Sequence, residues 1–311
     1  MPYKWCFSEK GKMLLKQLNI NFNEVDEGIQ CCNYPKCLIM QNNDASVLEK
    51  SSSGGVIPEI VDLVRTNGGS CFGVVFADDF LSLKYVEIDD SNKNLAMGSK
   101  YINSLLDEVN KKRIVELLES GKHVVFIGRP CQCHWMRNNF SKYKNLVLVE
   151  LFCFGVPDDN LWKNYIGELI SEHGKIKSVN FRDKLTGWKN YSLTIEFENG
   201  YVLSEPHGKN RYMCDYLSRN NLMSKCLVCK FRSEILSKSD IICGDAWGID
   251  VANDNGTSIV LANTYVGEQL LNQIKWKFNV SYPTEEQKKA IVNSNFGSPK
   301  LVLKSASKYN K

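Results

Sequence analysis

Two apolar runs that each end in a glycine-containing turn with a cysteine place the strongest constraint on the fold. Residues 123–128 (HVVFIG) lead into GRPCQ, which holds Cys131. Residues 145–151 (NLVLVEL) lead into FCFGVP, which holds Cys153. A strand that runs into such a turn and then a helix is typical of open α/β sheets, which place ligands at the carboxyl ends of their strands. The sequence therefore predicts an α/β (α+β) fold with a mixed sheet flanked by helices, and both thiols at one sheet edge.

A Cys-x-x-Cys pair, Cys226 and Cys229, indicates a metal or cluster site. Two thiols separated by two residues can bind one metal or one cluster edge, because the intervening turn places both sulfurs on the same side. Further thiols must complete such a site, and Cys131 and Cys153 are available upstream. The segment continues into SDIICGDAWG, which reads as a strand ending in a tight glycine turn.

The cysteine content bears on the compartment. The 311 residues include 12 cysteines, and the opening MPYKWCFSEKGKMLL lacks the apolar segment of a secretory signal. We therefore expect a cytoplasmic location, since in a reducing compartment clustered cysteines more often bind metals or do redox chemistry than form disulfides. The cysteines of the first 45 residues lack ferredoxin spacing and are expected to be small buried or surface residues: Cys6, Cys31, Cys32 and Cys37.

Charge and hydropathy argue against two other classes of protein. The net charge is +4, and the Lys and Arg residues are scattered along the chain, so we expect no nucleic-acid partner. No apolar run approaches the roughly 20 residues needed to cross a bilayer. We therefore expect no membrane span.

Two hydroxyl-rich segments are candidates for binding an anion. The first, SSSGG at residues 51–55, precedes a predicted helix, and a glycine-rich helix N-terminus suits a phosphate. A serine cap on an ordinary helix is the alternative. The second, MGSKYINS at residues 97–104, offers Ser99, Lys100 and Ser104 to an anionic ligand, or forms an ordinary solvated loop.

The remaining pattern alternates between helices and strands. A β-hairpin is expected at residues 191–204, with Arg182 and Lys184 just ahead of it, where they can meet a phosphate or carboxylate or protect a sheet edge. Other expected elements are helices at 10–18, 56–64, 105–119, 159–173 and 266–278 and strands at 71–76, 81–88 and 257–264. The expected divisions are a reduced N-terminal segment (1–45), the N-terminal and C-terminal parts of one main domain (46–122 and 123–285) and a tail (286–311).

Seven short motifs occur in a characteristic order over residues 51–270: SSSGG, GSKY-x-x-S, G-x-PCQ, C-x-GVP, FR-x-K-x-x-GW, C-x-x-C-x-F and SDI-x-x-GD-x-WG. In this order and spacing the chain resembles the coenzyme F420 hydrogenase/dehydrogenase β-subunit family. The specificity comes from the concatenation, since no single motif is decisive. Many members also carry an N-terminal two-cluster ferredoxin module, which is not expected here.

The resemblance implies an FAD-dependent and [4Fe-4S]-dependent oxidoreductase that passes electrons between an iron-sulfur carrier and a hydride-accepting or hydride-donating substrate. Its partners would be a separate electron-transfer protein such as a ferredoxin and a small-molecule substrate or deazaflavin. The implied cluster ligands are Cys131, Cys153, Cys226 and Cys229. The implied flavin-site residues are Ser52, Ser53, Gly54, Gly55, Ser99, Lys100, Tyr101, Gly244, Asp245 and Trp247.

Two positions near the implied cluster ligands depart from the family pattern. Arg129 stands where threonine is usual, and its positive charge is expected to raise a reduction potential. Phe154 stands where histidine is usual and removes a proton donor. The alternative to a redox enzyme is a zinc-stabilised or cofactor-poor scaffold that binds a redox partner or a phosphorylated ligand, with Cys214 and Cys243 completing a structural zinc site.

Overall fold

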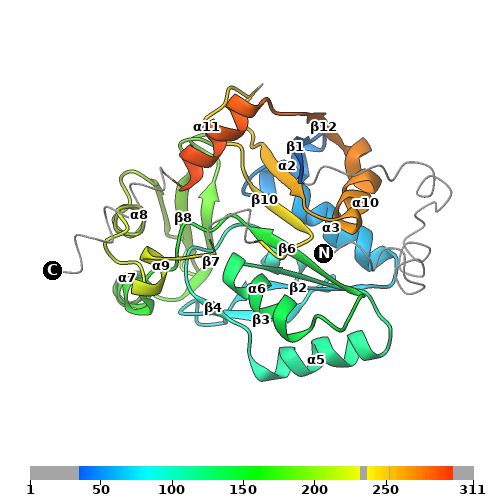
Figure 1. Ribbon diagram of the computed structural model, residues 1–311. Coiled ribbons are helices and arrows are strands. Elements are labelled where there is room, and N and C mark those ends of the chain that lie inside the picture. Colours follow the sequence, from blue (N-terminus) through cyan, green and yellow to red (C-terminus); the bar gives the residue numbers. More distant parts are fainter. Residues whose placement is uncertain (1–34, 232–236, 252, 297–311) are drawn as a thin grey trace, which may run out of the picture.

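The computed structural model describes residues 35–231, 237–251 and 253–296 (Figure 1). The helix expected at residues 10–18 and residues 297–311 of the expected tail lie outside these residues. None of the helices within the described ranges is long and apolar enough to cross a membrane.

A large mixed sheet forms the centre of the described chain, as the sequence predicts (Figure 1). Its inner strands β10, β6, β5 and β2 run parallel to one another, and antiparallel strands adjoin both sides of this group. The strand order among the described residues is β12 (Phe278–Ser281), β1 (Lys36–Asn42), β11 (Ser258–Ala262), β10 (Ile241–Asp245), β6 (Leu146–Leu151), β5 (Val124–Gly128), β2 (Ser70–Phe76), β3 (Leu83–Glu87) and β4 (Ser104–Leu105).

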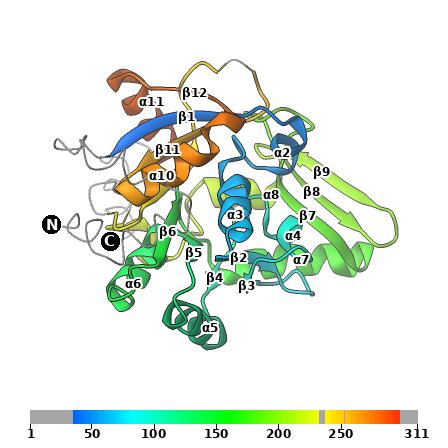
Figure 2. The same cartoon turned by 90° about the vertical axis from the view of Figure 1, so that its right-hand side faces the viewer.

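Helices cover both faces of this sheet (Figure 2). Along β5, Val125 packs in the core under α3 (Val56–Thr66) and α10 (Tyr265–Ile274), while the next residue, Phe126, packs under α5 (Glu108–Glu119) and α6 (Pro130–Asn139). A parallel strand buried on both faces requires a continuous apolar run. This requirement explains why β5 and β6 can be recognised in the sequence.

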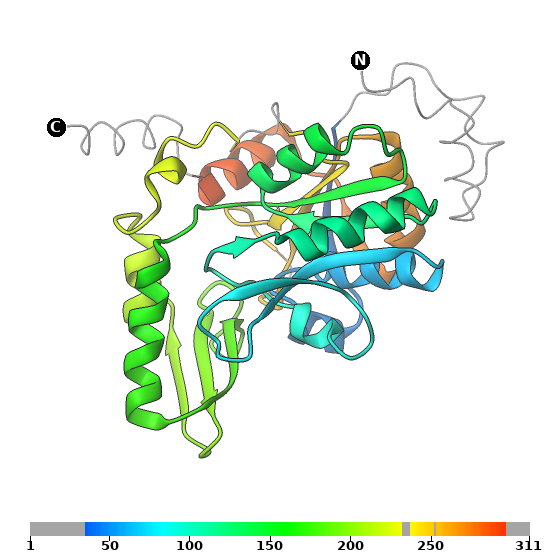
Figure 3. The same ribbon diagram turned by 90° about the horizontal axis from the view of Figure 1, so that it is seen from below.

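A smaller antiparallel sheet lies beside the large one (Figure 3). The predicted hairpin is present as β8 (Ser192–Phe197) and β9 (Val202–Pro206), and β7 (Ile176–Asp183) adds a third strand. Its core is shared with α7 (Asp159–His173), which lies along the sheet in Figure 3, and with α8 (Arg211–Leu217).

Several elements differ from the sequence prediction. The helix expected from residue 105 begins at Glu108, because the Asp107 side chain accepts a hydrogen bond from Asn110 N and caps it. The helix expected to reach residue 278 ends at Ile274, and β12 follows it after a short turn. The elements without a sequence prediction are β1, β4, β7, β12, α2 (Ala45–Lys50), α4 (Lys93–Ala96), α8, α9 (Ser224–Leu227) and α11 (Glu285–Phe296).

Candidate functional site

A cavity of about 690 Å³ lies at the carboxyl ends of β5, β6 and β10. Its volume is typical of sites for small molecules and cofactors, roughly 300–1,000 Å³. Three parallel strands deliver their ends to one sheet edge, and this edge is where open α/β sheets bind ligands. The walls include nine of the ten residues expected around a flavin: Ser52, Ser53, Gly55, Ser99, Lys100, Tyr101, Gly244, Asp245 and Trp247.

Gly54, the tenth of these residues, has a packing role instead. A Cβ atom there would lie 2.1 Å from Met40 O and 2.7 Å from Ser258 N. Only glycine lets the loop approach β1 and β11 this closely. The sequence does not distinguish Gly54 from Gly55, which lines the cavity as the N-cap of α3.

The N-terminus of α3 opens into the cavity beside an unpartnered hydroxyl. No side chain in the described part of the chain caps this helix, so its first N–H groups and its partial positive charge are available to an anion. Ser51 is 7 % exposed and lines the cavity, yet its Oγ has no hydrogen-bond partner among the described residues. The Ser52 hydroxyl instead accepts from Ser99 N (2.5 Å), and the Ser53 hydroxyl donates to Thr257 O (2.8 Å).

Lys100 contributes an amine to the cavity wall, and burial destabilises its protonated form. Its Nζ donates to the carbonyl oxygen of Met97 (2.8 Å) and contacts those of Ala96 and Gly98. No carboxylate within the described ranges pairs with it. Burial lowers the pKa of Lys100 to about 7, so near neutral pH the side chain can gain or lose a proton.

A buried ion pair joins the two sheets at the cavity wall. Arg182, at the end of β7, donates to both carboxylate oxygens of Asp245, at the end of β10, over 2.8 and 3.3 Å. It also donates to Tyr101 Oη (2.9 Å) and Ser52 O (3.2 Å). Burial opposes the charge, but attraction to Asp245 outweighs it and raises the pKa of Arg182. Of the two partners expected for Arg182, phosphate or carboxylate, the structure therefore places a carboxylate against it.

Aromatic rings enclose this guanidinium. It lies 4.2 Å from the ring centroid of Tyr191 and 5.2 Å from that of Trp247. Trp247 stacks on the buried Trp188 at 4.4 Å, and Tyr191 stacks on His207 at 4.4 Å. No sequence motif marks Tyr191 or His207. They adjoin the hairpin strands β8 and β9, and which end of the hairpin faces the cavity depends on how the two sheets pack together.

Of the four predicted cluster ligands, Cys153 lines the cavity, and Cys131 follows Arg129, which lines it too. Burial raises the pKa of Cys131, in the first turn of α6; Arg129 opposes the rise, and the nearby thiols of Cys229 and Cys226 add to it. These effects place Cys131 within electrostatic range of the Cys-x-x-Cys pair.

Two further contacts bring the same segments together. On α6, the ring of His134 lies 4.9 Å from that of Phe231, which follows Cys229 closely in the chain. Pro157 pairs antiparallel with Leu222, and Met223 N donates to Val156 O (2.9 Å). Cys153 lies four residues before Pro157 in the first of these antiparallel segments, and Cys226 lies four residues after Leu222 in the second.

The described residues do not form a closed metal site. No three His, Cys, Asp or Glu side chains within the described ranges group tightly enough to hold a metal ion. The other thiols include three that are buried in strands or helices, as expected for small apolar residues: Cys71, Cys133 and Cys243.

The two residues that depart from the family pattern both face the cavity. Arg129 follows β5 and donates to Ser104 O (2.6 Å). Phe154 lies beside Arg219, whose guanidinium carbon is 4.3 Å from the ring centroid.

Comparison with known proteins supports the family resemblance and the fold. Residues 121–287 match the family described as the C terminus of the beta subunit of coenzyme F420 hydrogenase/dehydrogenase. A similar solved structure is a chain of the F420-reducing [NiFe] hydrogenase complex from Methanosarcina barkeri, with a TM-score of 0.56 and 16% sequence identity over 88% of this chain and 90% of that one. At this identity the likeness is one of fold. No curated protein matches the sequence.

Proposed function

Because the chain belongs to the coenzyme F420 hydrogenase/dehydrogenase β-subunit family, a family of redox proteins, we propose that it is an FAD-dependent and [4Fe-4S]-dependent oxidoreductase. It passes electrons between an iron-sulfur carrier and a substrate that accepts or donates a hydride. One observation carries the proposal: residues from distant parts of the sequence that match the family motifs, Cys153 among them, line a single cavity.

The cavity suits FAD in size and chemistry. The free N-terminus of α3 and the unpartnered Ser51 hydroxyl fit a pyrophosphate. Tyr101 and Trp247 offer aromatic surface to a planar ring. Asp245 is already paired with Arg182, so the cations of the wall outweigh its one carboxylate and favour an anionic cofactor.

The four matching cysteines offer the kind of ligand that an iron-sulfur cluster requires. Thiolates are the usual ligands of such clusters, and Cys131 lies close enough to Cys226 and Cys229 for their charges to interact. Cys153 faces the cavity. We propose these four residues as ligands and assign no coordination geometry to them.

The cofactors would supply the electron chemistry, with FAD exchanging electron pairs as hydride and the cluster exchanging single electrons. The residues of the chain would bind the cofactor and orient it. The α3 terminus would hold the anionic end of the cofactor, and the Arg182–Asp245 pair positions Tyr101 at the cavity. The stacked rings of Trp188 and Trp247 exclude water from one wall.

Partners and location follow from the same proposal. An F420-reducing complex contains the similar solved chain, so a deazaflavin is one candidate substrate here. A separate electron-transfer protein such as a ferredoxin would deliver or collect single electrons, in the cytoplasm.

The structure gives the zinc-scaffold alternative no specific support. Cys243 belongs to the buried core of the large sheet, and Cys214 Sγ lies 3.7 Å from His207 O on another element.

The test is an ultraviolet-visible spectrum of anaerobically purified protein, with iron, sulfide and zinc assayed in the same sample. Flavin bands and a broad shoulder that bleaches with dithionite, together with about four irons per chain, are expected if one cluster is present. A colourless protein with one zinc per chain would contradict the proposal.

A further inference from the structure

Arg129 lies at the cavity wall, close in sequence to the proposed cluster ligand Cys131. Its side chain lines the cavity, and it precedes Cys131 by two residues. The guanidinium donates to Ser104 O over 2.6 Å, to Gln132 Oε1 over 3.1 Å and, from both terminal nitrogens, to Asn103 Oδ1 over 3.3 Å. All of these acceptors are neutral groups.

The charge of Arg129 is therefore not cancelled locally. Within the part of the chain that the structure describes, no carboxylate lies in ion-pair range of it. Two other cations of the cavity wall differ, since Arg182 is paired with Asp245 and burial lowers the pKa of Lys100 to about 7. A guanidinium keeps its proton at every physiological pH.

We propose that Arg129 makes the cavity bind the reduced, more negatively charged form of its flavin more tightly than the oxidised form, and so raises the flavin's reduction potential. Reduction takes up two electrons from the electron-transfer partner and one proton from solvent, which forms a new N–H bond and leaves one extra negative charge. An uncompensated cation at the wall attracts that charge. This inference rests on the proposed function.

Asn103 offers a test that leaves Arg129 in place. Asn103→Asp puts a carboxylate against both terminal nitrogens of the guanidinium, with almost no change in shape. Arg129→Gln removes the charge directly, and Arg129→Lys keeps the charge while losing the fork. Arg211→Gln, at an exposed position on α8 outside the cavity, is the control for net charge.

The measurement is the dissociation constant of oxidised and of reduced FAD, with the midpoint potential of the bound flavin. Asn103→Asp and Arg129→Gln are each expected to lower the preference for reduced flavin about tenfold, which corresponds to a midpoint about 30 mV more negative for a two-electron couple. Arg129→Lys and Arg211→Gln are expected to keep the wild-type value.

Two outcomes would overturn the inference. One is an unchanged midpoint in Asn103→Asp with flavin bound, because the charge would then have no influence on the ligand. The other is an equal shift in Arg211→Gln, because the effect would then come from net charge alone. Wild-type protein that binds no FAD would instead overturn the proposed function on which the inference rests.

Discussion

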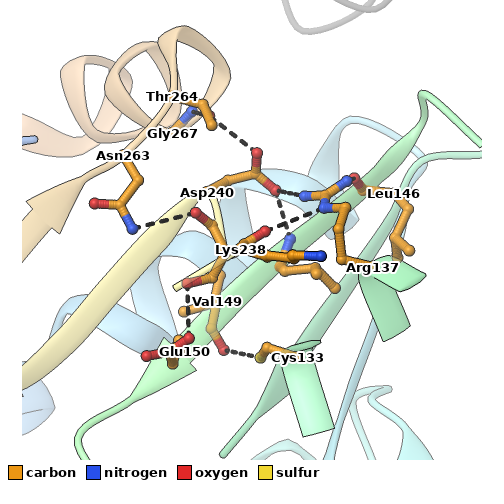
Figure 4. Close-up of polar contacts among 12 residues, drawn as sticks. Cys133, Arg137, Leu146, Val149, Glu150, Lys238, Asp240, Asn263, Thr264 and Gly267 are labelled. Carbon is orange, nitrogen blue, oxygen red and sulfur yellow. Dashed lines mark hydrogen bonds and ion pairs between the residues drawn. The ribbon is translucent and has the colours of Figure 1, made fainter. Parts of the chain in front are cut away.

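An Arg–Asp pair lies at each end of β10, and the two pairs differ in how completely their polar groups are satisfied. At the start of the strand, Asp240 accepts from Arg137, from Leu148 N and from Thr264 Oγ1 (Figure 4). Arg137 in turn donates to backbone carbonyls, Lys238 O among them. This pair ties α6 and α10 to the sheet.

At the other end of β10, the pair of Arg182 and Asp245 is incomplete. The Arg182 Nε is buried without a partner among the described residues, and the Ser51 hydroxyl nearby on the same cavity is also unpartnered. Because unsatisfied buried polar groups destabilise a fold, the presence of two of them on one cavity supports a ligand site there. The satisfied pair builds the architecture, and the unsatisfied pair belongs to the site.

Removing the satisfied pair should have the largest effect on stability. Asp240→Ala leaves Arg137 Nη2 and Leu148 N without their acceptor, and we expect the free energy of unfolding to fall by about 3–5 kcal/mol. Chemical denaturation measures this. Asp90→Ala, which removes a carboxylate that is 96% exposed, should cost under about 1 kcal/mol, and equal losses in both variants would remove the basis of the comparison.

Changing the carboxylate at the cavity should affect both binding and folding. Asp245→Asn keeps the shape but weakens the contact with Arg182, which positions Tyr101. We expect unfolding to become easier by about 1–3 kcal/mol and FAD affinity to fall about tenfold. Flavin titration and denaturation of the same sample check both values. Unaltered FAD affinity would show that the pair is only structural.

Lys100 should make stability depend on pH. Its folded pKa of about 7 lies below its ordinary value of 10.5, so between these pH values the unfolded chain binds more protons. The free energy of unfolding should therefore rise with pH across this window, more steeply than in Lys100→Met by up to about 1.4 kcal/mol per pH unit. Parallel pH profiles for the two proteins would contradict the burial of an uncompensated amine.

The smallest effects are expected when the neighbouring hydroxyls of Ser51 and Ser53 are removed. Ser51→Ala removes an unsatisfied buried group, so the flavin-free protein should keep its stability or gain up to about 1 kcal/mol while FAD affinity falls several-fold. Ser53→Ala breaks the bond to Thr257 O and should cost about 1 kcal/mol. Thermal unfolding with and without FAD separates the two, and a destabilised Ser51→Ala would show that its hydroxyl is already satisfied.

The sequence predicts the elements whose signal is local. The apolar runs of β5 and β6 and the helical periodicity of α3 are visible because burial on both faces, or on one stripe, demands them. The strand at Lys36–Asn42 is not visible, since its apolar run is short and both of its partner strands are more than 200 residues away. The mostly polar α11 has little apolar periodicity, although Ile291 is fully buried.

The site follows the same rule. Short motifs mark many of the residues that line the cavity, but no motif pairs Arg182 with Asp245, which lie 63 positions apart. The positions of Tyr191 and His207 depend on how the small sheet packs against the large one. Contacts between elements distant in sequence are set by tertiary packing, which local pattern does not encode.

Titration of flavin-free protein with FAD, followed by flavin fluorescence under anaerobic conditions, tests the central claim most directly. We predict saturable binding of one FAD per chain with quenched fluorescence, because aromatic side chains line the cavity. Binding should weaken in Asp245→Asn and stay unchanged in a folded Asp240→Asn variant. An absence of saturable binding, or equal losses in both variants, would contradict the assignment of the unsatisfied end of β10 as the ligand site.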